Sequence, residues 1–420
     1  MPTKEAVAAL PARPSLIACD ADQRGRGGLA GAAVFKIACV RPGWAPDVLS
    51  LFLELAALPS PPGEERAVAD RVLDYVRTLG LEHDEDDAGT RIGASMGNVL
   101  CRIPPSDGRA GTPIFLCAHL DTVPPEGPIE PVVAEDEVVR NAAGTILGAD
   151  DKSAVAAMLE AAARLVEEGR PHAGVELLFT PKEEVGLQGA AAFDEHRLTA
   201  RFGYVFDHAG PIGEVILGAP YQRKLEVRFH GRAAHAGMYP EEGRSAIAAA
   251  ARAIADLRLG RLDEETSANV GQIEGGTARN VVPEHCRVVA EARSHDERKL
   301  ADVVQEMLET VTFAATLAEC EVETQVEGSA RGYRFRRDDR PVRMATTALE
   351  RAGREPSFIL SGGGADANVF NERGLQCVNL ANGMTDIHTP DERIAVADLE
   401  TMVEVTLSLI AVAAETDDAG

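Results

Sequence analysis

The chain has 420 residues, a formal net charge of −25 and 45% hydrophobic residues. Because this negative surface would repel phosphates and anionic lipids, we expect neither nucleic acid nor a membrane as a partner. The length predicts two domains, or one domain with a large insertion. The seven cysteines are scattered without a C-x-x-C pair, and the first residues do not have the pattern of a signal peptide, so a reducing, cytoplasmic location is expected.

Residues 1–43 differ in composition from the rest of the chain. They are rich in Ala, Gly, Arg and Pro and show no sustained periodicity, which is typical of segments that cannot bury enough apolar surface to fold. We predict a disordered leader, which either belongs to the native protein or is translated sequence upstream of its natural start.

From residue 44 onwards the pattern is that of an open α/β sheet. A first helix begins near Pro46, where Leu49, Phe52, Leu53 and Ala56 have the spacing of one helical face. Further helices are predicted at 64–79 and 151–168, with strands at 98–103, 114–118, 175–180 and 204–206.

After Gly218 the pattern changes to that of a half-exposed antiparallel sheet. Leu225, Val227 and Phe229 alternate with charged or polar neighbours. The elements that follow are predicted helices at 245–257 and 296–318, and strands at 268–274, 285–293 and 321–326. The resulting β-α-β-β-α-β order is ferredoxin-like. We therefore predict a mixed-sheet α/β catalytic domain, residues 44–218 and 331–420, interrupted by a small α+β domain, residues 219–330.

Histidines and acidic residues follow the predicted strands. His119 ends the strand at 114–118, and Asp121 lies two residues further, where it could accept a hydrogen bond from the imidazole and orient it. Asp150 and Asp151 directly precede a helix, where helix capping is the ordinary alternative. Taken singly, each residue has such an ordinary explanation.

The later strands end in the same way. Glu183 and Glu184 follow the strand at 175–180, and because neighbouring side chains diverge, one can bind a metal while the other faces a bound water. Asp207 ends the strand at 204–206, and His388 lies in a loop after another apolar segment. Solvated loop residues or helix caps are again the alternatives.

The joint pattern predicts a metal centre, because open α/β sheets bind ligands beyond the carboxyl ends of their strands. Two histidines and three carboxylates suit two divalent ions per subunit, with Asp150 bridging them. The predicted ligands are His119, Asp150, Glu184, Asp207 and His388. Zn²⁺ is expected, with Co²⁺ and Mn²⁺ as alternatives. Three carboxylates and a bridging hydroxide would balance the charge of the two ions.

Six short motifs resemble a known family. They are Ala-His-Leu-Asp-Thr (118–122), Gly-Ala-Asp-Asp-Lys (148–152), Glu-Glu-Val-Gly (183–186), His-Ala-Gly (235–237), Gly-Gly-Thr-Ala-Arg-Asn (275–280) and Ser-Gly-Gly-Gly-Ala-Asp-Ala-Asn-Val-Phe (361–370). As a set they resemble the co-catalytic zinc peptidases that include peptidase T, carboxypeptidase G, aminoacylase and succinyl-diaminopimelate desuccinylase. The likeness is greatest to the peptidase T-like branch and covers about residues 45 to 412.

The resemblance divides the predicted ligands between the two metals. His119 and Asp207 would hold one ion, Glu184 and His388 the other, and Asp150 both.

It also implies roles for their neighbours. Asp121 would orient His119, Glu183 would be the general base, and the peptide bond between Asp150 and Asp151 would be cis.

The inserted domain would be a lid and homodimerisation domain. His235 would reach an active site and steady the oxyanion, although a turn histidine is the alternative. Asn280, Arg293 and Gly363 would bind substrate, and the planar fork of an arginine suits a carboxylate. A solvated strand-end arginine is the alternative for Arg293.

These features predict a dinuclear exopeptidase that hydrolyses short peptides with a metal-bridged hydroxide, in particular a tripeptide aminopeptidase. An N-acyl amino acid deacylase or a carboxypeptidase with the same metal centre is the alternative. Asp rather than Glu at position 207 weakly favours the peptidases.

Three rivals are less favoured. A serine hydrolase elbow at 93–97 and a dinucleotide fingerprint at 25–30 both lack the required strand–turn–helix context. A non-catalytic binding protein would be expected to lack a ligand or the base.

Overall fold

The structure is a computed structural model that describes residues 47–106 and 111–416. The predicted leader, residues 1–43, and the glycine-rich segment at 25–30 lie outside the described residues. Within those residues, no helix is long and apolar enough to cross a lipid bilayer.

The main sheet of the described chain has nine strands in the order β1-β2-β6-β3-β7-β16-β8-β14, with β15 also paired to β8. Its strands are β1 (Glu82–Glu85), β2 (Val99–Ile103), β3 (Ile114–His119), β6 (Val175–Thr180), β7 (Phe202–Val205), β8 (Glu214–Ala219), β14 (Tyr333–Arg334), β15 (Ser357–Leu360) and β16 (Gln376–Leu380). β6, β3, β7 and β16 are adjacent and parallel, so their carboxyl ends share one edge.

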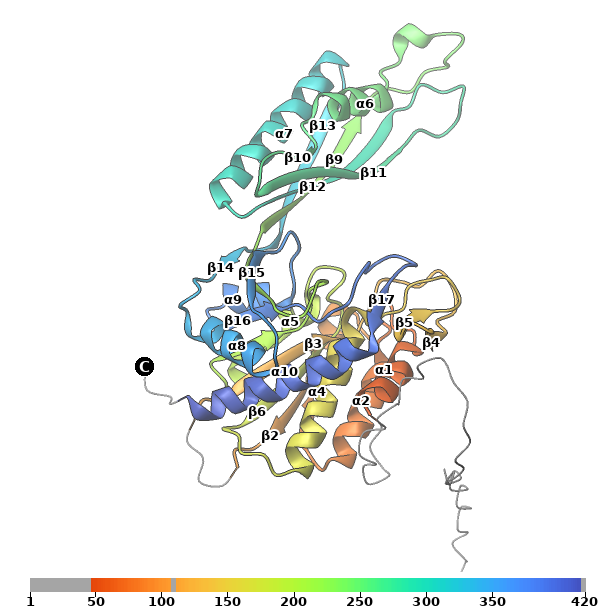
Figure 1. Cartoon of the computed structure of the whole chain (residues 1–420). Coiled ribbons are helices and arrows are strands. Elements are labelled where there is room, and N and C mark those ends of the chain that lie inside the picture. Colours follow the sequence, from red (N-terminus) through yellow and green to blue (C-terminus); the bar gives the residue numbers. More distant parts are fainter. Residues whose placement is uncertain (1–46, 107–110, 417–420) are drawn as a thin grey trace, which may run out of the picture. The chain divides into compact units, whose positions relative to one another are not determined.

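Both faces of this sheet are buried, which explains the continuous apolar runs in its central strands. Ile114, Leu116 and Ala118 of β3 face one hydrophobic cluster, and Phe115 and Cys117 face another. The first cluster is covered by α1 (Val48–Ala56), α2 (Arg66–Thr78), α4 (Ala149–Glu167), α8 (Arg340–Arg351) and α10 (Val396–Glu415). The second is covered by α5 (Gln188–Ala192) and α9 (Asp366–Glu372) (Figure 1).

The prediction of which residues of the first helix are buried is only partly correct. Phe52 and Ala56 are buried, but Leu49 and Leu53 are only partly so, while Leu51 and Leu55 are fully buried. The reason is tertiary: α1 contacts both α4 and α10, so its buried face is turned toward them.

A second sheet has the order β10-β11-β12-β9-β13 and matches the predicted ferredoxin-like arrangement. Its elements are β9 (Tyr221–His230), α6 (Ala246–Asp256), β10 (Gly260–Arg261), β11 (Thr266–Gly275), β12 (His285–Ser294), α7 (Glu297–Leu317) and β13 (Glu321–Ala330). Both helices pack on the same sheet (Figure 1). Burial alternates along β12, as expected for a sheet with one covered face. The mixed-sheet α/β fold with an inserted ferredoxin-like module is therefore confirmed.

Two smaller features complete the fold. β4 (Pro131–Val133), β5 (Val138–Asn141) and β17 (Arg393–Ala395) form a three-stranded sheet that the sequence did not predict. The short helix α3 (Ala88–Ile92) precedes the serine motif at 93–97, and β2 follows it. A nucleophile elbow needs the opposite order, strand and then helix, so the motif is not an elbow here.

Candidate metal centre

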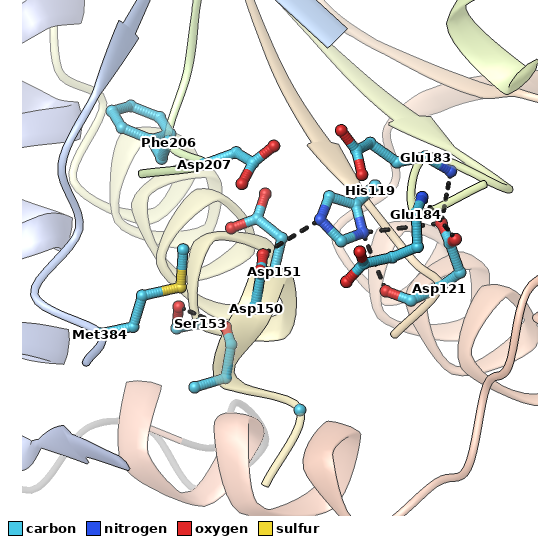
Figure 2. A network of polar contacts seen from close by, with 12 residues as sticks. His119, Asp121, Asp150, Asp151, Ser153, Glu183, Glu184, Phe206, Asp207 and Met384 are labelled. Carbon is cyan, nitrogen blue, oxygen red and sulfur yellow. Dashed lines mark hydrogen bonds and ion pairs between the residues drawn. The ribbon is translucent and has the colours of Figure 1, made fainter. Parts of the chain in front are cut away.

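The predicted ligands meet because three neighbouring parallel strands end beside one another. His119 is the last residue of β3, Glu183 and Glu184 follow β6, and Asp207 follows β7. Figure 2 shows the carboxylates of Glu183 and Asp207 close to the His119 ring, with Asp150 at the start of α4.

The ligand atoms form two groups that share one aspartate. His119, Asp150 and Asp207 each offer a ligand atom within 4.8 Å of the others, and so do Asp150, Glu184 and His388. His119 Nε2 lies 3.2 Å from Asp150 Oδ1, whereas His388 Nε2 lies 3.2 Å from Asp150 Oδ2. His388 Nε2 also lies 3.0 Å from Glu184 Oε1. Each oxygen of Asp150 therefore faces one group, as a bridging carboxylate requires.

The electrostatics of this cluster suit cations. Burial raises the pKa of Asp207 well above its usual range, and the nearby Asp150 carboxylate raises it further. Burial likewise raises the pKa of Glu183, with Asp207 adding to the effect. Buried carboxylates at such close range are costly unless a cation neutralises them. Imidazole nitrogens and carboxylate oxygens are also a donor set that zinc and similar ions accept.

The imidazole of His119 lies against Asp121, which offers it a backbone carbonyl oxygen as well as the carboxylate predicted to orient it. Its Nδ1 lies 2.8 Å from the carbonyl oxygen of Asp121 and 3.6 Å from that residue's Oδ1. An Nδ1–H donated to the carbonyl leaves Nε2 free for a metal. An extended chain would place only the carboxylate of Asp121 beside the ring, but β3 ends at His119.

The Asp121 carboxylate also accepts hydrogen bonds from the backbone that follows β6. It accepts the backbone N–H of Glu183 at 2.9 Å and that of Glu184 at 3.1 Å (Figure 2). Asp121 thus fixes the backbone of the predicted base and of the adjacent predicted ligand.

A cavity of about 480 Å³ opens onto the cluster. Glu183 and all the predicted ligands except His119 line it, together with the predicted substrate residues Arg293 and Gly363. Arg293 is the one lysine or arginine among the described residues that line this cavity. Its guanidinium donates to the carbonyl oxygen of Gly362 at 3.2 Å and contacts Glu291 at 2.9 Å.

His235 and Asn280 are not among the described residues lining this cavity. They lie beside each other, since the N–H of Ala236 donates to the Asn280 carbonyl at 3.0 Å, and both are exposed. His235 Nδ1 accepts the N–H of Gly237 at 3.2 Å and of Met238 at 3.1 Å, which leaves the proton on Nε2.

Four polar residues near the cluster were not predicted from the sequence. Asn379 of β16 exchanges two hydrogen bonds with the backbone of Asp207, and Asn382 donates to the Phe206 carbonyl at 2.7 Å. Two buried carboxylates, Asp366 and Glu392, complete the set. Polar residues at the end of an apolar strand were the available signal for Asn379 and Asn382.

Asp366 is buried beside Thr180, the last residue of β6. Its Oδ2 accepts the hydroxyl of Thr180 at 2.5 Å, and burial raises the pKa of Asp366 to about 6. It lies in the glycine-rich motif at 361–370, but the sequence assigned it no role.

Histidines and carboxylates gather at the carboxyl edge of an α/β sheet, in a chain with a ferredoxin-like insertion, as the sequence predicted for a metal-dependent hydrolase. Residues 115–412 match the family described as peptidase family M20/M25/M40. The chain belongs to this peptidase family.

Similar proteins confirm the resemblance to the peptidase T-like branch. The protein YqjE of Bacillus subtilis is 38% identical over 368 residues, which cover 88% of this chain and 98% of that protein. The crystal structure of aminopeptidase PepT from Bacillus cereus is similar with a TM-score of 0.77 and 39% identity, over 87% of this chain and 98% of that one. A tripeptidase from Staphylococcus aureus gives a TM-score of 0.82 and 34% identity, over 88% of this chain and 98% of that one.

Proposed function

We propose that the chain is a dinuclear metal-dependent exopeptidase that hydrolyses short peptides, and in particular a tripeptide aminopeptidase of the cytoplasm. The observation that carries this proposal is the sharing of Asp150 between two ligand groups, beside Glu183 in one cavity. The similar structures from Bacillus cereus and Staphylococcus aureus are described as an aminopeptidase and a tripeptidase, which supports the choice of substrate.

The metal ligands would be those found in the two groups, with zinc as the expected ion. Two bound ions would polarise the scissile carbonyl and lower the pKa of a water molecule. Glu183 would accept the proton of that water and then deliver it to the leaving nitrogen. Burial and neighbouring carboxylates raise the pKa of Glu183, which suits a group that must hold a proton and then release it.

Residues 219–330 would form a lid and homodimerisation domain, with residues 44–218 and 331–420 as the catalytic domain. His235 would donate from Nε2 to the oxyanion in an active site. Its Nδ1 is already occupied by backbone N–H groups, which supports that tautomer. Because His235 is not among the residues lining this chain's own cavity, the role requires movement of the lid or a second copy of the chain.

A substrate panel tests this proposal. Purified protein loaded with zinc should release the N-terminal residue from free tripeptides, and a chelator should stop the release. Cleavage of N-acyl amino acids alone would identify the deacylase instead, an alternative that Arg293 also fits because it can bind any free carboxylate. Turnover of neither class by metal-loaded protein would contradict the proposal.

Arg293→Ala should raise the KM for peptides with a free C-terminus about 10- to 100-fold. Hydrogen bonds to charged groups contribute about 1.5–3 kcal/mol, and about 1.4 kcal/mol corresponds to a tenfold change. C-terminally amidated peptides should show a smaller difference between variant and wild type.

Arg287→Ala is the matched control for this measurement. Arg287 lies six residues away on β12 and pairs with Glu226 at 2.7 Å, but it is not among the residues lining the cavity. An equal rise in KM for both variants would count against a carboxylate site at Arg293.

A further inference from the structure

Glu392 is a buried carboxylate whose side chain accepts hydrogen bonds from one short backbone segment, residues 147–150. Its side chain is 2% exposed. Oε2 accepts the N–H of Leu147 at 2.7 Å and of Gly148 at 2.8 Å, and Oε1 accepts the N–H of Asp150 at 3.0 Å. Hydrogen bonds to an ionised acceptor are stronger than neutral ones, so these three contacts fix the segment firmly.

The backbone N–H groups of this segment need a hydrogen-bond acceptor from elsewhere in the chain, because the backbone here is not yet helical. Gly148 has a φ of +76°, and Asp150 has φ −80° and ψ 106°. The peptide bond between Asp150 and Asp151 is cis, as the resemblance implied. The first N–H groups of a helix have no partner within the helix, and the helix dipole favours an anion there. Glu392 supplies that anion at the start of α4.

Glu392 also joins this segment to the loop that carries His388. It lies four residues after His388, and its N–H donates to the Thr389 carbonyl at 3.1 Å in a turn. His388 itself has a φ of +62°, and its side chain is 46% exposed. Packing therefore does little to hold the histidine in place. Glu392, at the end of the loop, connects the loop by hydrogen bonds to the backbone segment that contains Asp150.

We propose that Glu392 is a positioning residue. It holds Asp150, which both ligand groups share, and the loop that carries His388 in the positions needed to bind the two metals. The proposal rests on the dinuclear centre proposed above. Glu392 does not line the substrate cavity, so its effect would pass through Asp150 and His388 rather than through contact with substrate.

Glu392→Gln tests this role with little change in volume. The amide offers one acceptor oxygen and an NH₂ group, so at least one backbone N–H would meet a donor instead of an acceptor. We expect metal affinity, measured by competition with a chromophoric chelator, to fall about 10- to 100-fold, as for other groups that orient metal ligands. The absorption spectrum of the Co²⁺-loaded variant should also change, and kcat should fall at saturating metal while KM stays constant.

Glu176→Gln is the matched control. Glu176 is 3% exposed, and its carboxylate accepts the N–H of Thr199 and of Ala200, both at 2.9 Å, away from the cavity. It should bind metal and turn over substrate like wild type. If Glu176→Gln weakens metal binding as much as Glu392→Gln does, the loss is general destabilisation and the positioning role is refuted.

If Glu392→Gln does not fold, Glu392→Asp tests the same role. It keeps the charge that faces the buried Lys152 but is one methylene shorter, so it cannot reach all three N–H groups. Weaker metal binding supports the proposal, and unchanged metal binding overturns it. Wild-type protein that binds no metal would refute the proposed function itself. Wild-type protein that binds two ions, with variants of equal affinity, would refute only the role of Glu392.

Discussion

Glu183→Gln is expected to lower kcat about 10²- to 10⁴-fold, the usual contribution of a general base. The amide cannot accept the proton of the attacking water. Fold and metal content should not change, because the backbone N–H of Glu183 would still donate to Asp121 and its side chain belongs to neither ligand group. Turnover against tripeptides and metal content by elemental analysis would be measured on the same preparation.

The neighbouring residue provides the control for this experiment. Glu184 is held by the same Asp121 carboxylate but belongs to a ligand group. Glu184→Gln should therefore lose about one ion per chain, whereas Glu183→Gln should retain both. Substantial activity in Glu183→Gln would remove Glu183 from the role of base.

Removal of the metals should abolish activity and destabilise the folded chain. Two groups of ligands, built around the buried Asp150, would be left without a cation. Each ion at about 100 times its Kd would stabilise the fold by about 2.7 kcal/mol. Calorimetry should show a higher Tm when Zn²⁺ is added to the metal-free protein. Asp150→Ala should lose this response because both groups contain Asp150, whereas Asp136→Ala, at an exposed surface ion pair with Arg140, should keep it.

The rise in Tm on metal addition should itself depend on pH. Burial and neighbouring carboxylates raise the pKa of Asp207 and Glu183 in the metal-free chain. The folded state then holds protons that the unfolded state has released, so its stability falls as pH rises above the ordinary carboxyl range. Bound metal replaces those protons. The gain in Tm should therefore be larger at pH 8 than at pH 5, and a gain that shrinks with pH would contradict this account.

Elements with a strong local signal were predicted well. The predicted strand at 175–180 matches β6, and the helix predicted at 296–318 differs from α7 by one residue at each end. The five predicted ligands also fall into the two groups. The parallel order of β6, β3 and β7 brings together the strand ends that carry Glu184, His119 and Asp207.

Features that depend on a partner far along the chain were not predictable. The buried face of α1 depends on its contacts with α4 and α10. The acceptor for His119 Nδ1 depends on how the chain turns after β3. Glu392 looks like a solvated loop glutamate until the fold brings it to backbone 242 residues earlier in the chain.

The sequence by itself determined the α/β class, the ferredoxin-like insertion and the residue types that could hold metals. These follow from side-chain periodicity and from donor chemistry, which are local properties. Only the tertiary structure decided that Asp150 is shared between two groups, that Arg293 lines the same cavity while His235 does not, and that buried carboxylates fix the backbone behind the ligands. Those facts depend on distances between residues far apart in the chain, which only packing fixes.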